Sequence, residues 1–188
     1  MTNEQIIWNF LYEKLHNPYG VAALMGNLMA ESSLNPLCAN GVSKIGLTNS
    51  QYTEQVDNMQ YKNFVNDGIA YGLAQWCYKT RKEALLEMSQ VLGMSIGNIN
   101  LQLEYMWIEL QKYKTVLETL RNATNIKEAS DIVMLKYERP GNTSETMKQR
   151  RASYGENYYK KYNTNTIKLN LDVKTATSIM NEIKKTID

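Results

Sequence analysis

The sequence is poor in the residues that build metal centres and disulfide frameworks. Its 188 residues include one histidine, His16, and two cysteines, Cys38 and Cys77. A structural zinc site takes about four such ligands, and a disulfide scaffold takes several cysteine pairs, so the composition argues against both. A single disulfide between Cys38 and Cys77 stays open, but two buried free thiols are the stronger expectation. We expect no metal and no cofactor.

The chain also lacks strong charge and long apolar runs. A formal net charge of +2 leaves no electrostatic footprint for nucleic acid. No run approaches the roughly eighteen apolar residues that a membrane span needs, so we expect no membrane insertion. The first residues, MTNEQ, lack the basic stretch and apolar core of a signal peptide. If the protein works outside the cell, we expect a separate export route or delivery on a particle.

The length allows one domain with a real core and a short appendage. We expect this domain over residues 1–162 and a linker or tail over residues 163–188. Alternating apolar residues predict a strand from Ile167 to Val173, and a weakly helical stretch follows to Ile187. This tail either packs back on the domain or leads into a further module of a longer parent chain.

Start and stop signals of helices recur through the domain and predict a mostly α fold. Thr2 with Gln5, and Thr80 with Glu83, have the spacing of capping boxes, and Asn125 with Glu128 opens a further helix. Further helices are expected over residues 103–113, over 125–139, where Pro140 must stop the helix, and over 144–162.

The segment from Leu37 to Gly68 has little helical periodicity and is rich in Asn, Gln, Ser and Gly. We expect a short strand or hairpin from Val42 to Leu47. Long loops in compact domains are usually functional, so a cleft wall or lid is the natural role. Asp57, Asp67 and Glu54 are its candidate second carboxylates, and a solvated loop charge is the alternative for each.

Glu31 is the candidate proton donor. Val21, Leu24 and Leu28 belong to an apolar stripe with helical spacing. At about 100° per residue, Glu31 falls roughly 20° from Leu24, on the margin of this stripe, and Asn27 lies one turn earlier on the same flank. A carboxyl group there is costly to ionise, which suits a general acid that must still hold its proton. The alternative is an ordinary solvated glutamate at a helix end.

A second segment, Tyr71-Gly72-Leu73-Ala74-Gln75-Trp76, carries side chains that suit a sugar. Gly72 permits a tight turn and a close approach of a ligand. Gln75 offers a donor and an acceptor to sugar hydroxyl and N-acetyl groups. Tyr71, Trp76 and the nearby Tyr78 offer flat faces to a pyranose, unless Trp76 and Tyr78 are core aromatics.

In four places the chain resembles the phage tail-tip lysozymes of Gram-positive bacteria, which are related in fold to goose-type lysozymes and soluble lytic transglycosylases. The segments are GNLMAESSLNP (26–36), YGLAQW (71–76), KYERP (136–140) and RASYG (151–155). The resemblance runs from about Ile6 to Tyr162. It implies a mostly α, lysozyme-like α+β fold with a small β element lining the cleft.

The resemblance also implies cleavage of the peptidoglycan glycan strand outside the cell, with Glu31 as the catalytic acid. It leaves the second carboxylate open, with Asp67 slightly ahead of Asp57, and leaves hydrolysis, transglycosylation and a non-catalytic wall-binding module as alternatives. The transglycosylase relatives have Tyr-Asn-Ala-Gly where this chain has Tyr-Glu-Arg-Pro, so Tyr137 keeps a substrate or positioning role while Glu138 has no assigned partner. The partners to expect are peptidoglycan glycan strands, either a phage tail or a secretion assembly, and a second hydrolase domain.

Overall fold

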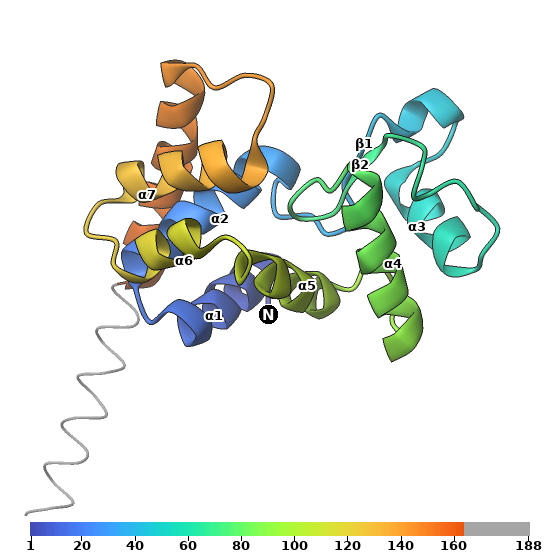
Figure 1. The fold of residues 1–188 in the computed structure, drawn as a ribbon, viewed down its shortest axis with the longest axis horizontal. Helices are drawn as coiled ribbons and strands as arrows, with labels where there is room; N and C mark the ends of the chain where they lie inside the picture. Colours follow the sequence, from blue (N-terminus) through green and yellow to red (C-terminus); the bar gives the residue numbers. More distant parts are fainter. Residues whose placement is uncertain (164–188) are drawn as a thin grey trace, which may run out of the picture.

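The structure, a computed structural model, describes residues 1–163 and is mostly helical with one small antiparallel sheet (Figure 1). This confirms the expected fold class. The strand and helix expected between Ile167 and Ile187 lie outside the described residues. The elements are α1 (Asn3–Leu15), α2 (Pro18–Ser32), β1 (Ala39–Asn40), the 3₁₀ turn η1 (Val42–Ile45), α3 (Asn49–Asp57), β2 (Ala70–Tyr71), α4 (Lys79–Leu92), α5 (Ile99–Leu110), α6 (Lys114–Arg121), α7 (Ile126–Val133), the π-helical turn η2 (Met134–Glu138) and a last helix over 145–163.

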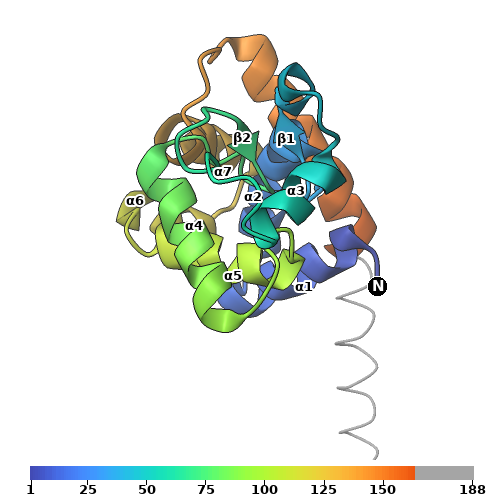
Figure 2. The same cartoon turned by 90° about the vertical axis from the view of Figure 1, so that its right-hand side faces the viewer.

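The helices fall into two groups with α5 between them. Figure 1 shows α1, α2, α6, α7 and the last helix on one side, and α3, α4 and the sheet on the other. Helix α5 contacts α1, α4 and α6, so it joins the groups. Figure 2 shows the same molecule from the side of α3 and α4, with the sheet toward the upper end of α4.

Helix α2 is the central element of the first group, and its start and packing follow from its sequence. Asn17 caps it by accepting hydrogen bonds from the backbone of Tyr19 and Gly20, and Pro18 takes the first helical position. At Gly26, a Cβ atom would lie 2.3 Å from the carbonyl oxygen of Arg151. Only glycine therefore lets the last helix approach α2 this closely.

The segment between α2 and β2 differs from the expectation. The strand expected from Val42 to Leu47 is wrong, because η1 occupies this stretch. Gly41 (φ 96°) and Gly46 (φ 74°) flank it in the left-handed region, which turns the chain at both ends and prevents an extended run. The sheet lies at the ends of the segment instead, where Ala39 pairs with Tyr71 and Asn40 with Ala70.

Helix α3 was not expected, although its signal is in the sequence. The Thr48 side chain accepts a hydrogen bond from the backbone of Gln51, and the Gln51 side chain accepts one from the backbone of Thr48. This capping box starts the helix despite the polar composition of the segment. The long loop is thus a folded unit.

Of the three residue pairs expected to start helices, two do so. Thr2 with Gln5 forms a capping box on α1, and Asn125 caps α7 by accepting a hydrogen bond from Glu128. The capping box expected at Thr80 is wrong, because α4 already begins after Tyr78. The carbonyl of Tyr78 accepts hydrogen bonds from the backbone of Arg81 and Lys82, in the first turn of the helix. Thr80 therefore lies inside the helix.

The two cysteines are free, as expected. Their expected burial is wrong, since Cys38 is partly exposed and Cys77 is exposed. Cys77 directly follows Trp76, whose side chain is fully buried. The side chain of Cys77 points the other way, toward solvent.

Candidate active site

The structure brings together the end of α2 and the 71–76 turn, the two segments in which the sequence predicted a site. The Ser32 hydroxyl donates to the carbonyl of Leu73 at 2.9 Å, and the Gly72 backbone donates to the carbonyl of Cys38 at 2.8 Å. Ser32 follows Glu31, so the last turn of α2 is fixed directly against the turn. The position of Glu31 relative to this turn is therefore set by hydrogen bonds.

The buried side chain of Gln102, on α5, holds the 71–76 turn in place through hydrogen bonds. Its Oε1 accepts from the Leu73 backbone at 2.8 Å, and its Nε2 donates to the carbonyls of Pro36 and Ile96. A Cβ atom on Gly72 would lie 2.7 Å from this Oε1, and Gly72 has φ 77°. The turn therefore needs glycine both for its backbone angle and for the space beneath it.

Glu31 lies in the last turn of α2 with its side chain 18% exposed. Arg151 of the last helix donates from Nη2 to Glu31 Oε1 at 2.5 Å, and from Nη1 to Asn27 Oδ1 at 3.1 Å. Asn27 is fully buried, and its amide donates to Ala23 and Ser130 rather than to Glu31. One guanidinium thus fixes the carboxylate while leaving part of it accessible.

Glu138, at the end of η2, is the second carboxyl group of the site. Its Oε1 is inaccessible to solvent and has no hydrogen-bond partner among the described residues, although the residue as a whole is partly exposed. Burial, and after it the negative charge of Glu31, raise the pKa of Glu138 well above its ordinary value, against the opposing effects of Arg81 and Arg151. A carboxyl group in this position retains its proton above its usual range.

Behind Glu138, the carboxylate of Glu109 organises a buried polar cluster. It accepts two hydrogen bonds from Arg81, at 2.7 and 2.8 Å, and one each from Trp76 Nε1 at 2.7 Å and the Tyr137 hydroxyl at 2.8 Å. Burial raises the pKa of Glu109, but the hydrogen bonds outweigh it, so the pKa lies below its usual value. Glu109 is therefore ionised and holds Arg81 close to Glu138.

Of the five residues predicted to contact sugar, three are buried. Tyr71 and Trp76 have no exposed surface and Tyr137 is 1% exposed, so their rings support the site in this conformation. Gln75 is partly exposed, but its amide donates to the carbonyls of Cys38 and Gly72. Tyr78 is 64% exposed and is the aromatic ring of this region that is open to a ligand.

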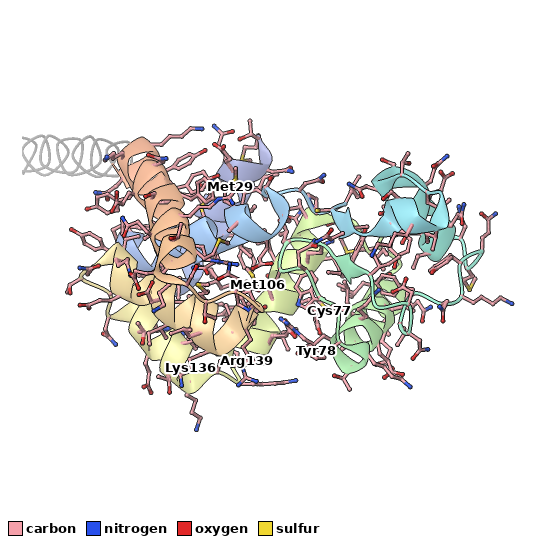
Figure 3. The ribbon with its side chains drawn as sticks, turned by 90° about the horizontal axis from the view of Figure 1, so that it is seen from above. Met29, Cys77, Tyr78, Met106, Lys136 and Arg139 are labelled. Atoms are coloured by element: carbon pink, nitrogen blue, oxygen red, sulfur yellow. The ribbon has the colours of Figure 1, made fainter. Side chains whose placement is uncertain are left out.

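Tyr78 lines a pocket of about 240 Å³ beside Glu138. Arg81, Tyr137 and Arg139 also line this pocket. Figure 3 labels Tyr78 just before α4 and Arg139 after η2, two residues from different segments that meet at this pocket. Aromatic, cationic and carboxyl groups thus converge in the pocket that Glu138 lines.

The two loop aspartates lie in other surroundings. Asp67 is 3% exposed, pairs with Lys82 at 2.6 Å and accepts from the Tyr52 hydroxyl at 2.5 Å. Asp57 accepts from the Ser95 hydroxyl at 2.5 Å and from the Ile96 backbone at 2.9 Å. Neither has a contact with Glu31 among the interactions of residues 1–163.

Sequence reasoning did not assign Arg151, Glu138, Arg81 and Glu109 to the site. Glu138 lies in the KYERP segment and Arg151 in the RASYG segment. The family resemblance therefore included both residues but assigned neither a role. Arg81 and Glu109 lie in ordinary amphipathic helices and had no local signal. Their part in the site depends on contacts across the fold.

Within the described part of the chain, no group of three or more His, Cys, Asp and Glu side chains is arranged to hold a metal ion. None of the helices over residues 1–163 is both long and apolar enough to cross a membrane. Residues 2–162 match the sequence profile of a family described as phage tail lysozyme. No curated protein matches the chain.

Proposed function

Because the chain belongs to the phage tail lysozyme family, we propose that it is an N-acetylmuramidase. It cleaves the β-1,4 bond between N-acetylmuramic acid and N-acetylglucosamine in the glycan strand of peptidoglycan. Membership assigns a lysozyme-like action on the cell wall, and the bond and the residues are our proposal. The observation that carries it is Glu31, a partly accessible carboxylate fixed by Arg151 at the junction of α2 and the 71–76 turn.

In the proposed reaction, Glu31 protonates the glycosidic oxygen as the bond from the sugar C1 to this oxygen breaks. The sugar ring then carries positive charge, water adds to C1, and the added water loses one proton, which replaces the proton that Glu31 gave up. Tyr78 and the 71–76 turn hold the strand, with Gln75 as the polar contact and Tyr71, Trp76 and Tyr137 as support. The catalytic unit is residues 1–162.

The fixed geometry around Glu31 suits this task. Arg151 and Asn27 leave the carboxylate little freedom to rotate, so the proton is delivered along a defined direction. A side chain that is 18% exposed is open to a ligand but shielded from bulk water, which strengthens its interaction with a developing charge.

A lytic transglycosylase acting on the same bond is the second candidate. Its specific support is the position of Asp57 and Asp67, which are hydrogen-bonded to other partners. A transglycosylase needs no carboxylate to activate water, because a hydroxyl group of the sugar attacks. A non-catalytic wall-binding module would need Glu31 to be idle.

We further propose that the protein acts from a phage tail on the outside of the host wall, with peptidoglycan as its partner. The family description supports the tail. A secretion assembly and a second hydrolase domain in a longer parent chain are alternative settings for the same activity.

The test is mass spectrometry of the soluble fragments released from purified Gram-positive peptidoglycan. Wild type is compared with Glu31→Gln and with Glu118→Gln, a matched control on the exposed face of α6. Reducible N-acetylmuramic acid ends that disappear only with Glu31→Gln support the muramidase. Anhydro ends assign a transglycosylase, and binding to walls without fragments from wild type contradicts both enzymes.

A further inference from the structure

Four cationic side chains line a second pocket, of about 330 Å³, beside the one that Glu138 lines. One side of it comes from the chain between α5 and α6, and the other from η2 and the residue that follows. The cations are Lys112, Lys114, Lys136 and Arg139. Figure 3 labels Lys136 and Arg139 at the same edge of the molecule. No acidic side chain of residues 1–163 lines this pocket.

These four cations are not neutralised by the described part of the chain. All four are exposed, and none has an ion-pair partner among residues 1–163. Arg81, Lys82 and Arg151, in contrast, each bind a carboxylate. The net charge of the chain is only +2, so the positive cluster is a local feature. Like charges around one pocket repel each other, and an anion bound between them would relieve this repulsion.

The start of α6 adds positive charge to the same pocket. Tyr113 precedes this helix and gives its first turn no side-chain cap. The first turn of a helix carries a partial positive charge on its free N–H groups, and Thr115 and Val116 of this turn line the pocket. The planar guanidinium group of Arg139 can donate to both oxygens of a carboxylate. The pocket therefore suits a carboxylate group of a ligand.

The two pockets adjoin, because Tyr113 and Arg139 line both of them. A ligand that contacts Tyr78 in the first pocket thus lies beside the cations of the second. Val116 is 1% exposed and Tyr113 is partly buried, so apolar side chains lie among the cations. This combination suits a peptide that carries carboxylates better than a phosphate polymer, which has little apolar surface to bury.

We propose that the 330 Å³ pocket binds a carboxylate of the peptidoglycan stem peptide, so that the protein prefers strands whose peptides carry free carboxylates. This inference rests on the proposed function, because it adds a peptide subsite to the site for the glycan strand. The stem peptide is attached to N-acetylmuramic acid, one of the two sugars at the proposed bond, so it leaves the strand close to that bond. The cations then contribute to substrate binding and not to the chemical step.

The first test measures cleavage by Lys114→Gln combined with Lys136→Gln, which removes two exposed charges of the pocket. The substrate is sonicated peptidoglycan freed of teichoic acid, either untreated or with its carboxylates converted to amides. On the untreated substrate we expect KM to rise about fivefold and kcat to stay within about twofold of wild type. On the amidated substrate the variant and wild type should have the same KM.

The matched control is Lys44→Gln combined with Lys62→Gln, two exposed lysines outside the pocket, and we expect it to behave as wild type on both substrates. An unchanged KM of the pocket variant on untreated peptidoglycan would show that the cluster is a solvated face. An equal rise on both substrates would show that carboxylates are not recognised. A difference seen only on walls that retain teichoic acid would assign the pocket to a phosphate group. Each of these three results overturns the inference.

The second test does not depend on cleavage. Sedimentation with insoluble peptidoglycan compares Glu31→Gln with the same protein carrying the two pocket substitutions. We expect binding about fivefold weaker with the substitutions, a difference that shrinks as salt is raised and is absent on amidated peptidoglycan. Equal binding of the two proteins to untreated peptidoglycan overturns the inference. If wild type releases no fragments, the proposed function fails, while this measurement still decides whether the pocket binds carboxylates.

Discussion

Two carboxylates of this molecule, Glu31 and Asp67, both form close ion pairs but differ in what surrounds them. Asp67 is 3% exposed, and its oxygens accept from Lys82, the Tyr52 hydroxyl and the Ile69 backbone. Glu31 is 18% exposed and has Arg151 as its single described hydrogen-bond partner. A saturated carboxylate contributes to the fold, whereas one with remaining capacity can engage a substrate.

The surroundings of the two pairs strengthen the contrast. Lys82 is fully buried, 4.2 Å from the centroid of the Phe64 ring, and burial lowers its pKa although Asp67 opposes the shift. The Asp67–Lys82 pair is thus closed on all sides by protein. The charges of Glu31 and Arg151 instead act on Glu138, whose Oε1 has no hydrogen-bond partner among residues 1–163.

The largest effect is expected at Glu31. Glu31→Gln removes the acid while keeping its hydrogen-bonding shape, so we expect strand cleavage to fall about 10²–10⁴-fold. The melting temperature should stay within a few degrees of wild type. Fragment release by mass spectrometry and a thermal melt measure the two quantities. Activity within about threefold of wild type would contradict the assigned role.

A large effect of the opposite kind is expected at Asp67. Asp67→Asn leaves the buried Lys82 ammonium without its counter-charge, which should lower the free energy of unfolding by about 3–5 kcal/mol. Cleavage per folded molecule should be unchanged. Urea denaturation measures the stability, and Asp67→Asn combined with Lys82→Met should recover part of it. Lost activity at unchanged stability would instead place Asp67 in the reaction.

A moderate and pH-dependent effect is expected from Glu138→Gln on stability. Because the pKa of Glu138 is raised in the folded protein, wild type keeps a proton there that the unfolded chain loses above about pH 4.3. The stability that this proton contributes to wild type is therefore fully present below that pH. It declines as the pH rises toward the pKa that Glu138 has in the folded protein.

The amide variant has no proton to lose, so its melting temperature should equal that of wild type at pH 4. At pH 8 the melting temperature of the variant should exceed that of wild type by about 2 °C or more. Thermal melts across this range test the prediction. A constant difference between the two proteins at all pH values would contradict it.

The smallest effect is expected at Asp57. Asp57→Ala removes the acceptor for Ser95 and the Ile96 backbone on an exposed turn, and should cost about 1 kcal/mol of unfolding free energy. Strand cleavage should stay at the wild-type level. A loss of cleavage larger than tenfold would restore Asp57 as a candidate second carboxylate.

How far the sequence could predict this molecule depends on the range of each interaction. The start of α2 and the margin position of Glu31 follow from residues within four positions of each other, and local periodicity identifies them. The capping box of Thr48 and Gln51 was equally local, but the polar composition of its segment hid it. Local signals were sufficient for most of the helices.

The partners of Glu31 could not be predicted in this way. Arg151 reaches it only because the last helix packs on Gly26, and Glu138 turns inward only through a π-helical turn whose sequence carries no familiar signature. Tyr71 and Trp76 show the converse case. Their rings suit a sugar by chemistry, but the packing of α5 and α3 buries them.

The contact between Glu31 and Arg151 joins residues 120 positions apart, and this separation has a consequence in time. A ribosome that adds about 5–20 residues per second takes roughly 6 to 24 seconds to proceed from one to the other. During synthesis, the carboxylate emerges long before the arginine that orients it. The Glu31–Arg151 pair therefore forms only after Arg151 has been added, and a product of translation that stalls earlier carries the proposed catalytic acid without the arginine that orients it.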